Sequence, residues 1–306
     1  MMKKQAKILC SMLLAALLTL SVFPATAFAQ TTDGETTGGQ ESVSYIDAFG
    51  VAHEHEAAAV TSDSVVWENG WYAVKENTEI DGRVQVRGDV NLILCNGVTL
   101  TPRLGIELFS GNSLTIWAQT QAENAMGGVT IRIPDENNFS GIDISNGSLT
   151  INGGKIQSTS GTIVNEEYSC GGAGIGGYGN VTINGGVVTA KGGDYAAGIG
   201  GTIGDEGCNV LITGGTVTAI SDGGAHAIGR GDMSNNPEFD ERYEDEDREE
   251  DLRLYGMRVT EPAGTLADQR IYCCRGWDGG DHTVKLEPCR NHEYVNGKCK
   301  WCCDPV

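Results

Sequence analysis

Four residues near the C-terminus have the types and the spacing of a metal site. They follow the pattern Cys-x2-His-x6-Cys-x2-Cys, formed by Cys289, His292, Cys299 and Cys302. Two short ligand pairs flank a central Asn-Gly dipeptide, which favours a tight hairpin turn. Three thiolates and one imidazole suit a closed, tetrahedral zinc site. Because protein groups would fill all four positions, we expect a structural zinc ion with no place for a substrate water.

The same cysteines also permit a disulfide interpretation. The chain has 10 cysteines, of which Cys10 lies in an apparent export signal. Disulfides form in an oxidising exterior, and His292 would then be a bystander. Without Cys10 the number of cysteines is odd, so disulfide pairing alone would leave one thiol free. If zinc bound three of these cysteines, an even number would remain for pairing. The remaining cysteines are Cys95, Cys170, Cys208, Cys273, Cys274, Cys289, Cys299, Cys302 and Cys303.

Two glycine-rich motifs resemble ligand-binding loops but lack the required context. Residues 172–177 match the G-x-G-x-x-G pattern of dinucleotide-binding proteins, which must open a helix. Here the strand-like run 181–183 follows. Residues 176–181 resemble a calcium-binding repeat, but Val181 stands where calcium requires an aspartate. We therefore interpret these glycines as turns and predict no cofactor-binding residue.

The histidines outside the tail give weak metal signals. His53 and His55 lie in a segment that we expect to be mobile. His226 replaces a glycine in a turn and is expected to be exposed rather than ligating, and His282 stands alone. The tail therefore holds the strongest local signal for chemistry.

A repeated sequence motif predicts the secondary structure of the central part of the chain. The run 147–154 returns at 179–186 and again at 208–215, after 32 and then 29 residues when its glycine pairs are aligned. A second phrase, Ala-Gly-Ile-Gly-Gly, occupies 173–177 and 197–201. A period of this length indicates stacked units, none of which could bury its own apolar row alone.

Each unit consists of short runs in which apolar and polar residues alternate, the period of a β-strand. We predict an all-β fold, a right-handed parallel β-helix (a solenoid) with a small C-terminal Cys/His-rich tail, since parallel crossovers are nearly always right-handed. A β-sandwich is the alternative, but it would favour Asn-Gly or Asp-Gly hairpin turns in place of the Gly-Gly pairs seen here. Superposed units predict these inward rows: Ile151, Ile183 and Ile212; Ile156, Val188 and Val217; Ser158, Ala190 and Ala219.

Catalysis on such a scaffold would leave a recognisable pattern. Enzymes built on β-helices cut polysaccharides with carboxylates that cluster at one strand position over successive coils. Asp143, Asp194 and Asp205 lie at scattered points of the repeats, and basic residues are few. We therefore predict no catalytic residue and treat a polysaccharide lyase or glycoside hydrolase as the alternative function.

The organisation along the chain follows from changes in composition. Trp67, Trp71 and Tyr72 are expected to cap the open core at the N-terminal end of the solenoid. Between Glu238 and Asp251 there are 10 carboxylates against two arginines, which predicts a solvated insertion. The predicted divisions are a signal peptide at 1–29, a flexible leader at 30–62, the capped β-helix at 63–235, the acidic insertion at 236–251, a closing coil or cap at 252–287 and the tail at 288–306.

The N-terminal segment predicts export. Lys3, Lys4 and Lys7 precede an apolar run over 8–22, and a small-residue cleavage site follows at 27–29. No second apolar stretch of membrane length follows, so we expect no transmembrane segment in the mature chain. The formal net charge of −20 disfavours binding to nucleic acid or anionic lipid. The expected location is extracellular or at the cell surface.

A run of residues from about 67 to 231 resembles a known group of proteins. Its opening, 67–72 followed by 88–97 and 111–116, is similar to exported parallel β-helix repeat proteins of gut Firmicutes, many of which also end in Cys–His tails. The resemblance implies an adhesin-like or carbohydrate-binding-like surface protein and carries no catalytic motif. We expect a secreted or cell-surface, non-catalytic protein whose partner is a polysaccharide or another cell-surface molecule.

Overall fold

The computed structural model describes residues 39–164, 169–232, 252–261, 282–295, 297–300 and 302. The predicted signal peptide and acidic insertion lie outside these residues, as do Cys273, Cys274 and Cys303. The compact unit that contains the described residues begins at Gly38. Every regular element in them is a β-strand.

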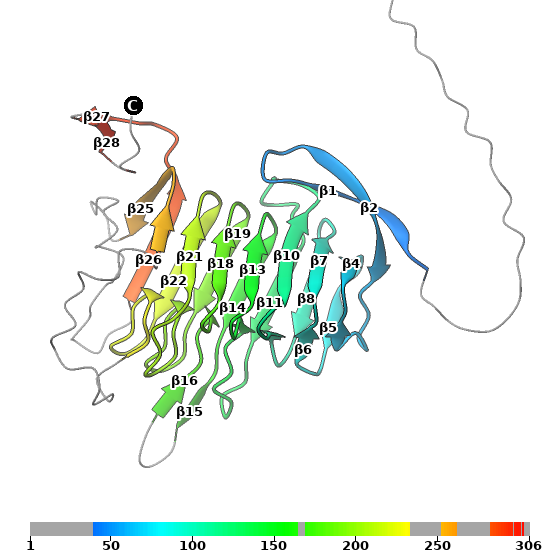
Figure 1. Cartoon of the computed structure of the whole chain (residues 1–306), viewed down its shortest axis with the longest axis horizontal. Helices are drawn as coiled ribbons and strands as arrows, with labels where there is room; N and C mark the ends of the chain where they lie inside the picture. The colour runs from blue at the N-terminus through cyan, green and yellow to red at the C-terminus, as the bar shows by residue number, and fades with distance from the viewer. Residues whose placement is uncertain are drawn as a thin grey trace, which may run out of the picture. The chain divides into compact units, whose positions relative to one another are not determined.

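Three sheets of mostly parallel strands run side by side along the stacked coils (Figure 1). Each coil contributes one strand to sheet A, then one to sheet C, then one to sheet B. Sheet A has nine strands: β1 (Glu41–Ile46), β2 (Ala52–Ala59), β4 (Gly70–Val74), β7 (Asp89–Leu94), β10 (Ser113–Ala118), β13 (Ser148–Ile151), β18 (Asn180–Ile183), β21 (Asn209–Ile212) and β24 (Leu252–Leu254).

The other two long sheets follow the same order along the coils. Sheet B has seven short strands: β3 (Val66–Trp67), β6 (Val84–Val86), β9 (Ile106–Leu108), β12 (Ile142–Asp143), β17 (Ile175–Gly176), β20 (Ile199–Gly200) and β23 (Ile228–Gly229). Sheet C has eight: β5 (Thr78–Ile80), β8 (Thr99–Pro102), β11 (Gly128–Arg132), β14 (Lys155–Thr159), β19 (Val187–Lys191), β22 (Thr216–Ser221), β26 (His282–Pro288) and β25 (Met257–Glu261).

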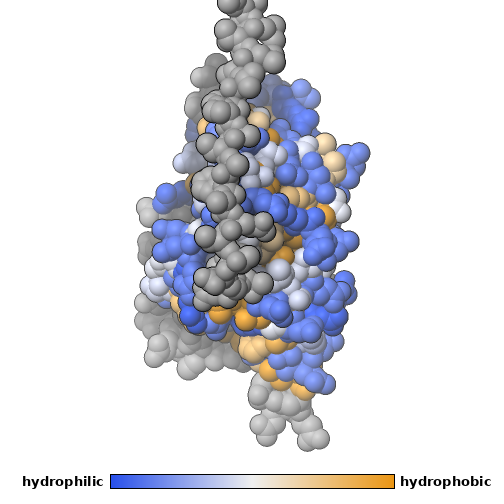
Figure 2. All heavy atoms as spheres, turned by 90° about the vertical axis from the view of Figure 1, so that its right-hand side faces the viewer, coloured by the Kyte–Doolittle hydropathy of each residue, from blue (hydrophilic) through white to orange (hydrophobic). Residues whose placement is uncertain are grey.

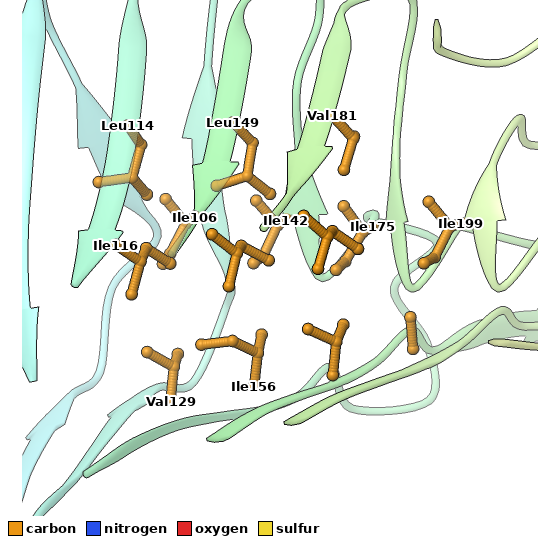
Figure 3. Packing of buried hydrophobic residues seen from close by; sticks show 14 of the residues in the cluster. Ile106, Leu114, Ile116, Val129, Ile142, Leu149, Ile156, Ile175, Val181 and Ile199 are labelled. Carbon is orange, nitrogen blue, oxygen red and sulfur yellow. The ribbon is translucent and has the colours of Figure 1, made fainter. Parts of the chain in front are cut away.

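The parallel β-helix prediction is confirmed in its register as well as its class. Ile151 pairs with Ile183, which pairs with Ile212, so the predicted inward row of sheet A is one column of neighbours. The equivalent columns of sheet C, 156-188-217 and 158-190-219, are also register partners. Alternation along each strand sends these side chains inward, where rows from the three sheets meet in one core (Figure 3).

The glycine corners are required by how closely one coil lies on the next. A Cβ on Gly200, whose φ is +143°, would stand 1.8 Å from the carbonyl oxygen of Gly229. A Cβ on Gly176 would stand 2.2 Å from the carbonyl oxygen of Gly200. The repeated Ala-Gly-Ile-Gly-Gly phrase therefore keeps side chains out of the space that the neighbouring backbone occupies.

The segment predicted to be a flexible leader is instead an ordered β-hairpin over most of its length. β1 and β2 pair antiparallel, β2 continues sheet A alongside β4, and Ile46 of β1 pairs with Ala118 of β10. Buried Val43 and Ala57 pack against the outer face of sheet A, on Ala73 and Ile93. We call this hairpin, 41–59, the strap. The strap folds because it covers an apolar patch that lies on the outside of the coils.

The aromatic residues predicted to cap the core divide between two roles. Trp67 is fully buried, and Tyr72 packs against the core that contains it. Trp71 points the other way and lies beneath the strap, with its ring centroid 5.0 Å from that of Tyr45 and 6.2 Å from that of Trp117. The N-terminal coils face the viewer in Figure 2, where hydrophilic surface surrounds small hydrophobic patches.

The C-terminal end closes differently from the coils. β26 lies between β22 and β25 and runs antiparallel to both. Leu286 and Val284 of β26 are buried in the main core together with Met257 of β25. Two small hairpins stand apart from the three sheets: β15 (Thr162–Val164) with β16 (Ser169–Gly171), and β27 (Tyr294–Val295) with β28 (Lys298–Cys299).

Candidate metal centre

The C-terminal strands bring the four predicted metal ligands together. Cys289 directly follows β26, and its backbone N–H donates to the carbonyl oxygen of Gly256 at 2.6 Å. The β27–β28 hairpin turns the chain back, so that Cys299 pairs with Tyr294. The ligand atoms of Cys289, His292, Cys299 and Cys302 all lie within 4.8 Å of one another.

The distances fit a tetrahedral metal better than a disulfide. The sulfur atoms of Cys289 and Cys299 are 3.8 Å apart, whereas a disulfide bond is about 2.05 Å long. Two sulfurs bound to zinc at about 2.3 Å each, at the tetrahedral angle, stand about 3.8 Å from each other. The sulfur of Cys302 lies 3.4 Å from Nδ1 of His292, close to the spacing of two ligands on one zinc ion.

The surroundings of the four groups suit a structural site. The three cysteines are buried and form a small cluster of their own, whereas His292 is exposed. The His292 ring stacks on that of Tyr294, with ring centroids 5.7 Å apart. Burial raises the pKa of the Cys289 thiol, so that thiol holds its proton more firmly unless a cation displaces it. Four protein ligands fit zinc and leave no open position.

The other histidines do not join a metal cluster among the described residues. In the strap, Nε2 of His53 lies 2.9 Å from the carboxylate of Asp47, and His55 stacks on Trp71 at 4.2 Å. The expectation that His226 is exposed was wrong, because its side chain is buried at the last glycine corner. The side chain of His282 lies outside the described residues.

Glu107 and Asp143, by contrast, form a cluster that the sequence analysis missed. They are register partners on β9 and β12, so two carboxylates stand on adjacent coils of sheet B. Arg83 reaches both, with Nη2 3.0 Å from Asp143 and Nε 3.6 Å from Glu107. The signal was present in the sequence, since each acid directly follows an equivalent Gly-Ile pair, 105–106 and 141–142.

The remaining two aspartates considered for catalysis are held by hydrogen bonds. Asp194 accepts hydrogen bonds from the hydroxyls of Thr162 and Ser169. Asp205 accepts from the hydroxyls of Tyr178 and Thr202. The hydrogen bond to Asp205 is the largest cause that raises the pKa of Tyr178 to about 12. These carboxylates therefore brace loops between coils.

The rejected dinucleotide motif has the structure that its context predicted. Residues 172–177 contain β17 and lead into the strand β18, without a helix whose N-terminus could face a phosphate. Gly172 and Gly174 lie against neighbouring backbone, where a Cβ would stand 2.4 Å and 2.6 Å from the nearest atoms.

Comparison with known proteins supports the β-helix repeat and gives no information on the candidate metal site. A family model described as a β-helix repeat matches residues 181–205 and 210–229, the coils from β18 to β23. The chain is therefore a parallel β-helix repeat protein over these coils. Searches of curated proteins and of solved structures gave no match. Among the described residues, no helix has the length and apolar character needed to cross a membrane.

Proposed function

We propose that this chain is an exported, right-handed parallel β-helix that binds glycans at or outside the cell surface without catalysis. The engagement of its coil carboxylates supports the absence of catalysis, and the resemblance of the coils to carbohydrate-binding-like surface proteins supports glycan binding. Asp143 is bound to Arg83 and to the hydroxyl of Ser145, and Asp194 and Asp205 are each held by two hydroxyls. Acid–base catalysis needs a carboxyl group that is available to the leaving oxygen or to a water.

The proposed location rests on the sequence. The basic and apolar N-terminal segment is typical of export, and the coils resemble those of adhesin-like surface proteins from gut Firmicutes. A net charge of −20 makes a neutral or basic partner more favourable than nucleic acid or an anionic surface.

The proposed role of the metal centre is structural. A zinc ion on Cys289, His292, Cys299 and Cys302 would fix the tail against β26, which itself covers β22. No ligand position would remain for substrate, so the ion would stabilise the end of the solenoid rather than take part in a reaction.

A polysaccharide lyase or glycoside hydrolase is the second candidate, and the Glu107–Asp143 pair favours it. Paired carboxylates about 5 Å apart serve retaining glycosidases, and partners on adjacent strands lie at about that distance. The guanidinium of Arg83 contacts both acids, however, which suits an ion-pair bridge between coils better than a proton donor and a nucleophile.

One experiment separates these functions. The purified full chain, with its metal, is applied to an array of neutral, basic and acidic polysaccharides, and the same samples are assayed for new reducing ends and unsaturated ends. Binding without new ends is the expected result. Release of ends that is lost in Glu107→Gln would establish the enzymatic function instead, and absence of binding to every glycan would overturn the proposal.

A further inference from the structure

The outer face of sheet B carries a set of residues that the established fold does not explain. Around the Arg83–Glu107–Asp143 cluster stand three partly exposed aromatic rings, each on a corner that adjoins sheet B. We call the whole set the B strip, which consists of Arg83, Glu107, Phe109, Phe139, Asp143 and Tyr178.

The centre of the strip is polar and ordered. Arg83 donates to the carbonyl oxygen of Leu104 at 3.2 Å and to Asp143 at 3.0 Å. The carboxylate of Glu107 is 3.6 Å from Nε of Arg83, too far for a hydrogen bond. The side chains of these three residues keep between 15% and 25% of their surface exposed. Two carboxylates against one guanidinium leave this centre with a net negative charge.

The aromatic residues lie on anchored stretches of backbone without being buried. Phe139 is 40% exposed, and the guanidinium carbon of Arg83 lies 4.6 Å from its ring centroid. Its carbonyl oxygen accepts a hydrogen bond from the hydroxyl of Ser160, which anchors the loop. Phe109 is 50% exposed and opens a turn in which the N–H of Asn112 donates to its carbonyl oxygen. Fixed aromatic groups lose little conformational entropy when a ligand binds.

The spacing along the coils matches an extended sugar chain. Glu107, Asp143 and Gly176 are register partners on three successive strands of sheet B. Phe109 lies two residues after Glu107, and Tyr178 lies two residues after Gly176. They are therefore two coils apart at the same corner of the solenoid, about 10 Å along its axis. Two pyranose units of an extended β-1,4-linked polysaccharide also span about this distance. Tyr178 is 54% exposed, and its hydroxyl is fixed by Asp205.

We propose that the B strip binds an extended neutral polysaccharide that runs along the coil axis. The C–H face of one sugar ring would pack on Phe109 and that of a second on Tyr178, because aromatic faces accept apolar surface. Hydroxyls between them would donate to the carboxylates of Glu107 and Asp143, which are acceptors when ionised. An acidic polysaccharide is disfavoured by the negative charge of the strip and of the whole chain. This inference rests on the proposed glycan-binding function.

The test uses single substitutions in the metal-loaded full chain, with cellohexaose, xylohexaose and chitohexaose as probes. Phe109→Ala and Tyr178→Ala should each weaken binding by about tenfold or more, as expected for central aromatic contacts. Phe49→Ala is the matched control, because Phe49 is 91% exposed at the tip of the strap, away from the B strip, and its loss should leave binding unchanged. Far-UV circular dichroism and thermal unfolding verify that each variant is folded.

The outcomes separate this inference from the function on which it rests. If the wild-type chain binds a neutral oligosaccharide and both strip variants bind it equally well, the B strip is overturned while glycan binding stands. Binding of wild-type chain only to acidic polysaccharides would also overturn the strip as a neutral-sugar site. If the wild-type chain binds no glycan, both proposals fail.

Discussion

A single guanidinium joins three coils of the solenoid. Arg83 precedes β6 and contacts Glu107 on β9 and Asp143 on β12, so one side chain spans successive strands of sheet B. Each contact joins parts of the chain that are far apart in sequence. The bridge is half-buried, and loss of one partner would leave charges without compensation.

We expect Arg83→Ala to lower the free energy of unfolding by about 2 kcal/mol, because two adjacent carboxylates lose their shared cation. Arg103→Ala is the matched control. Arg103 also pairs with two acids, Glu79 and Asp81, but its side chain is 57% exposed. Exposed pairs contribute little, so the control should cost about 0.5 kcal/mol or less. Urea denaturation measures both, and equal losses would contradict the bridge.

Tyr178 gives a prediction for high pH. Its hydrogen bond to Asp205 raises its pKa from 10.0 to about 12, so the folded state favours the protonated phenol. The contribution to stability is therefore fully present below pH 10 and is lost as the pH rises through about 12. Absorbance titration of tyrosinate should show a group that titrates near pH 12 in the wild type. Tyr178→Phe should remove this group, and Asp205→Asn should return it towards pH 10.

The proposed zinc ion should stabilise the elements at the C-terminus. We expect one zinc ion per chain, and we expect chelator treatment or Cys302→Ser to lower the melting temperature and loosen the tail, because metal binding contributes directly to folding. Cys170→Ser is the control, since Cys170 is half-buried elsewhere, near Asn138. Metal analysis by mass spectrometry and calorimetry provide the readouts. A pure chain with every thiol titratable and no bound zinc would end the proposal.

Glycine substitutions at the turns next to sheet B test how closely the coils must stack. Gly200→Ala would place a methyl group against the carbonyl oxygen of Gly229 and should cost about 3 kcal/mol or more, because neither backbone can move away. Gly204 also has a positive φ, +78°, but nothing lies within 4 Å of a Cβ built there. Gly204→Ala should therefore cost only about 1 kcal/mol, from the backbone conformation alone. Denaturant unfolding compares the two.

For the molecule as a whole, features that repeat were predictable and features that depend on distant partners were not. Superposed repeats place Ile183 between Ile151 and Ile212, and the structure has that register. The four tail residues that could hold a metal ion were recognisable because their spacing is local. Each of these signals lies within one repeat or one short segment of the chain.

The strap was missed because β2, the longer of its two strands, has no bulky apolar side chain. Ala57 is fully buried, but the surface that buries it comes from Ala73, Ile93 and neighbouring aromatic residues of the coils. The ion pair between Arg83 and Asp143 likewise joins residues 60 positions apart. Neither partnership has a local signal, since both arise only when the coils stack.

The reversed direction of β26 has a consequence for how these molecules behave at high concentration. A stack of parallel coils with an open end is a template on which another chain could continue the ladder. In sheet C that ladder stops at β22, because the next strand runs the opposite way and is itself covered by β25. The parallel ladder of sheet C thus has a built-in end, which should keep copies of this chain from continuing that ladder end to end.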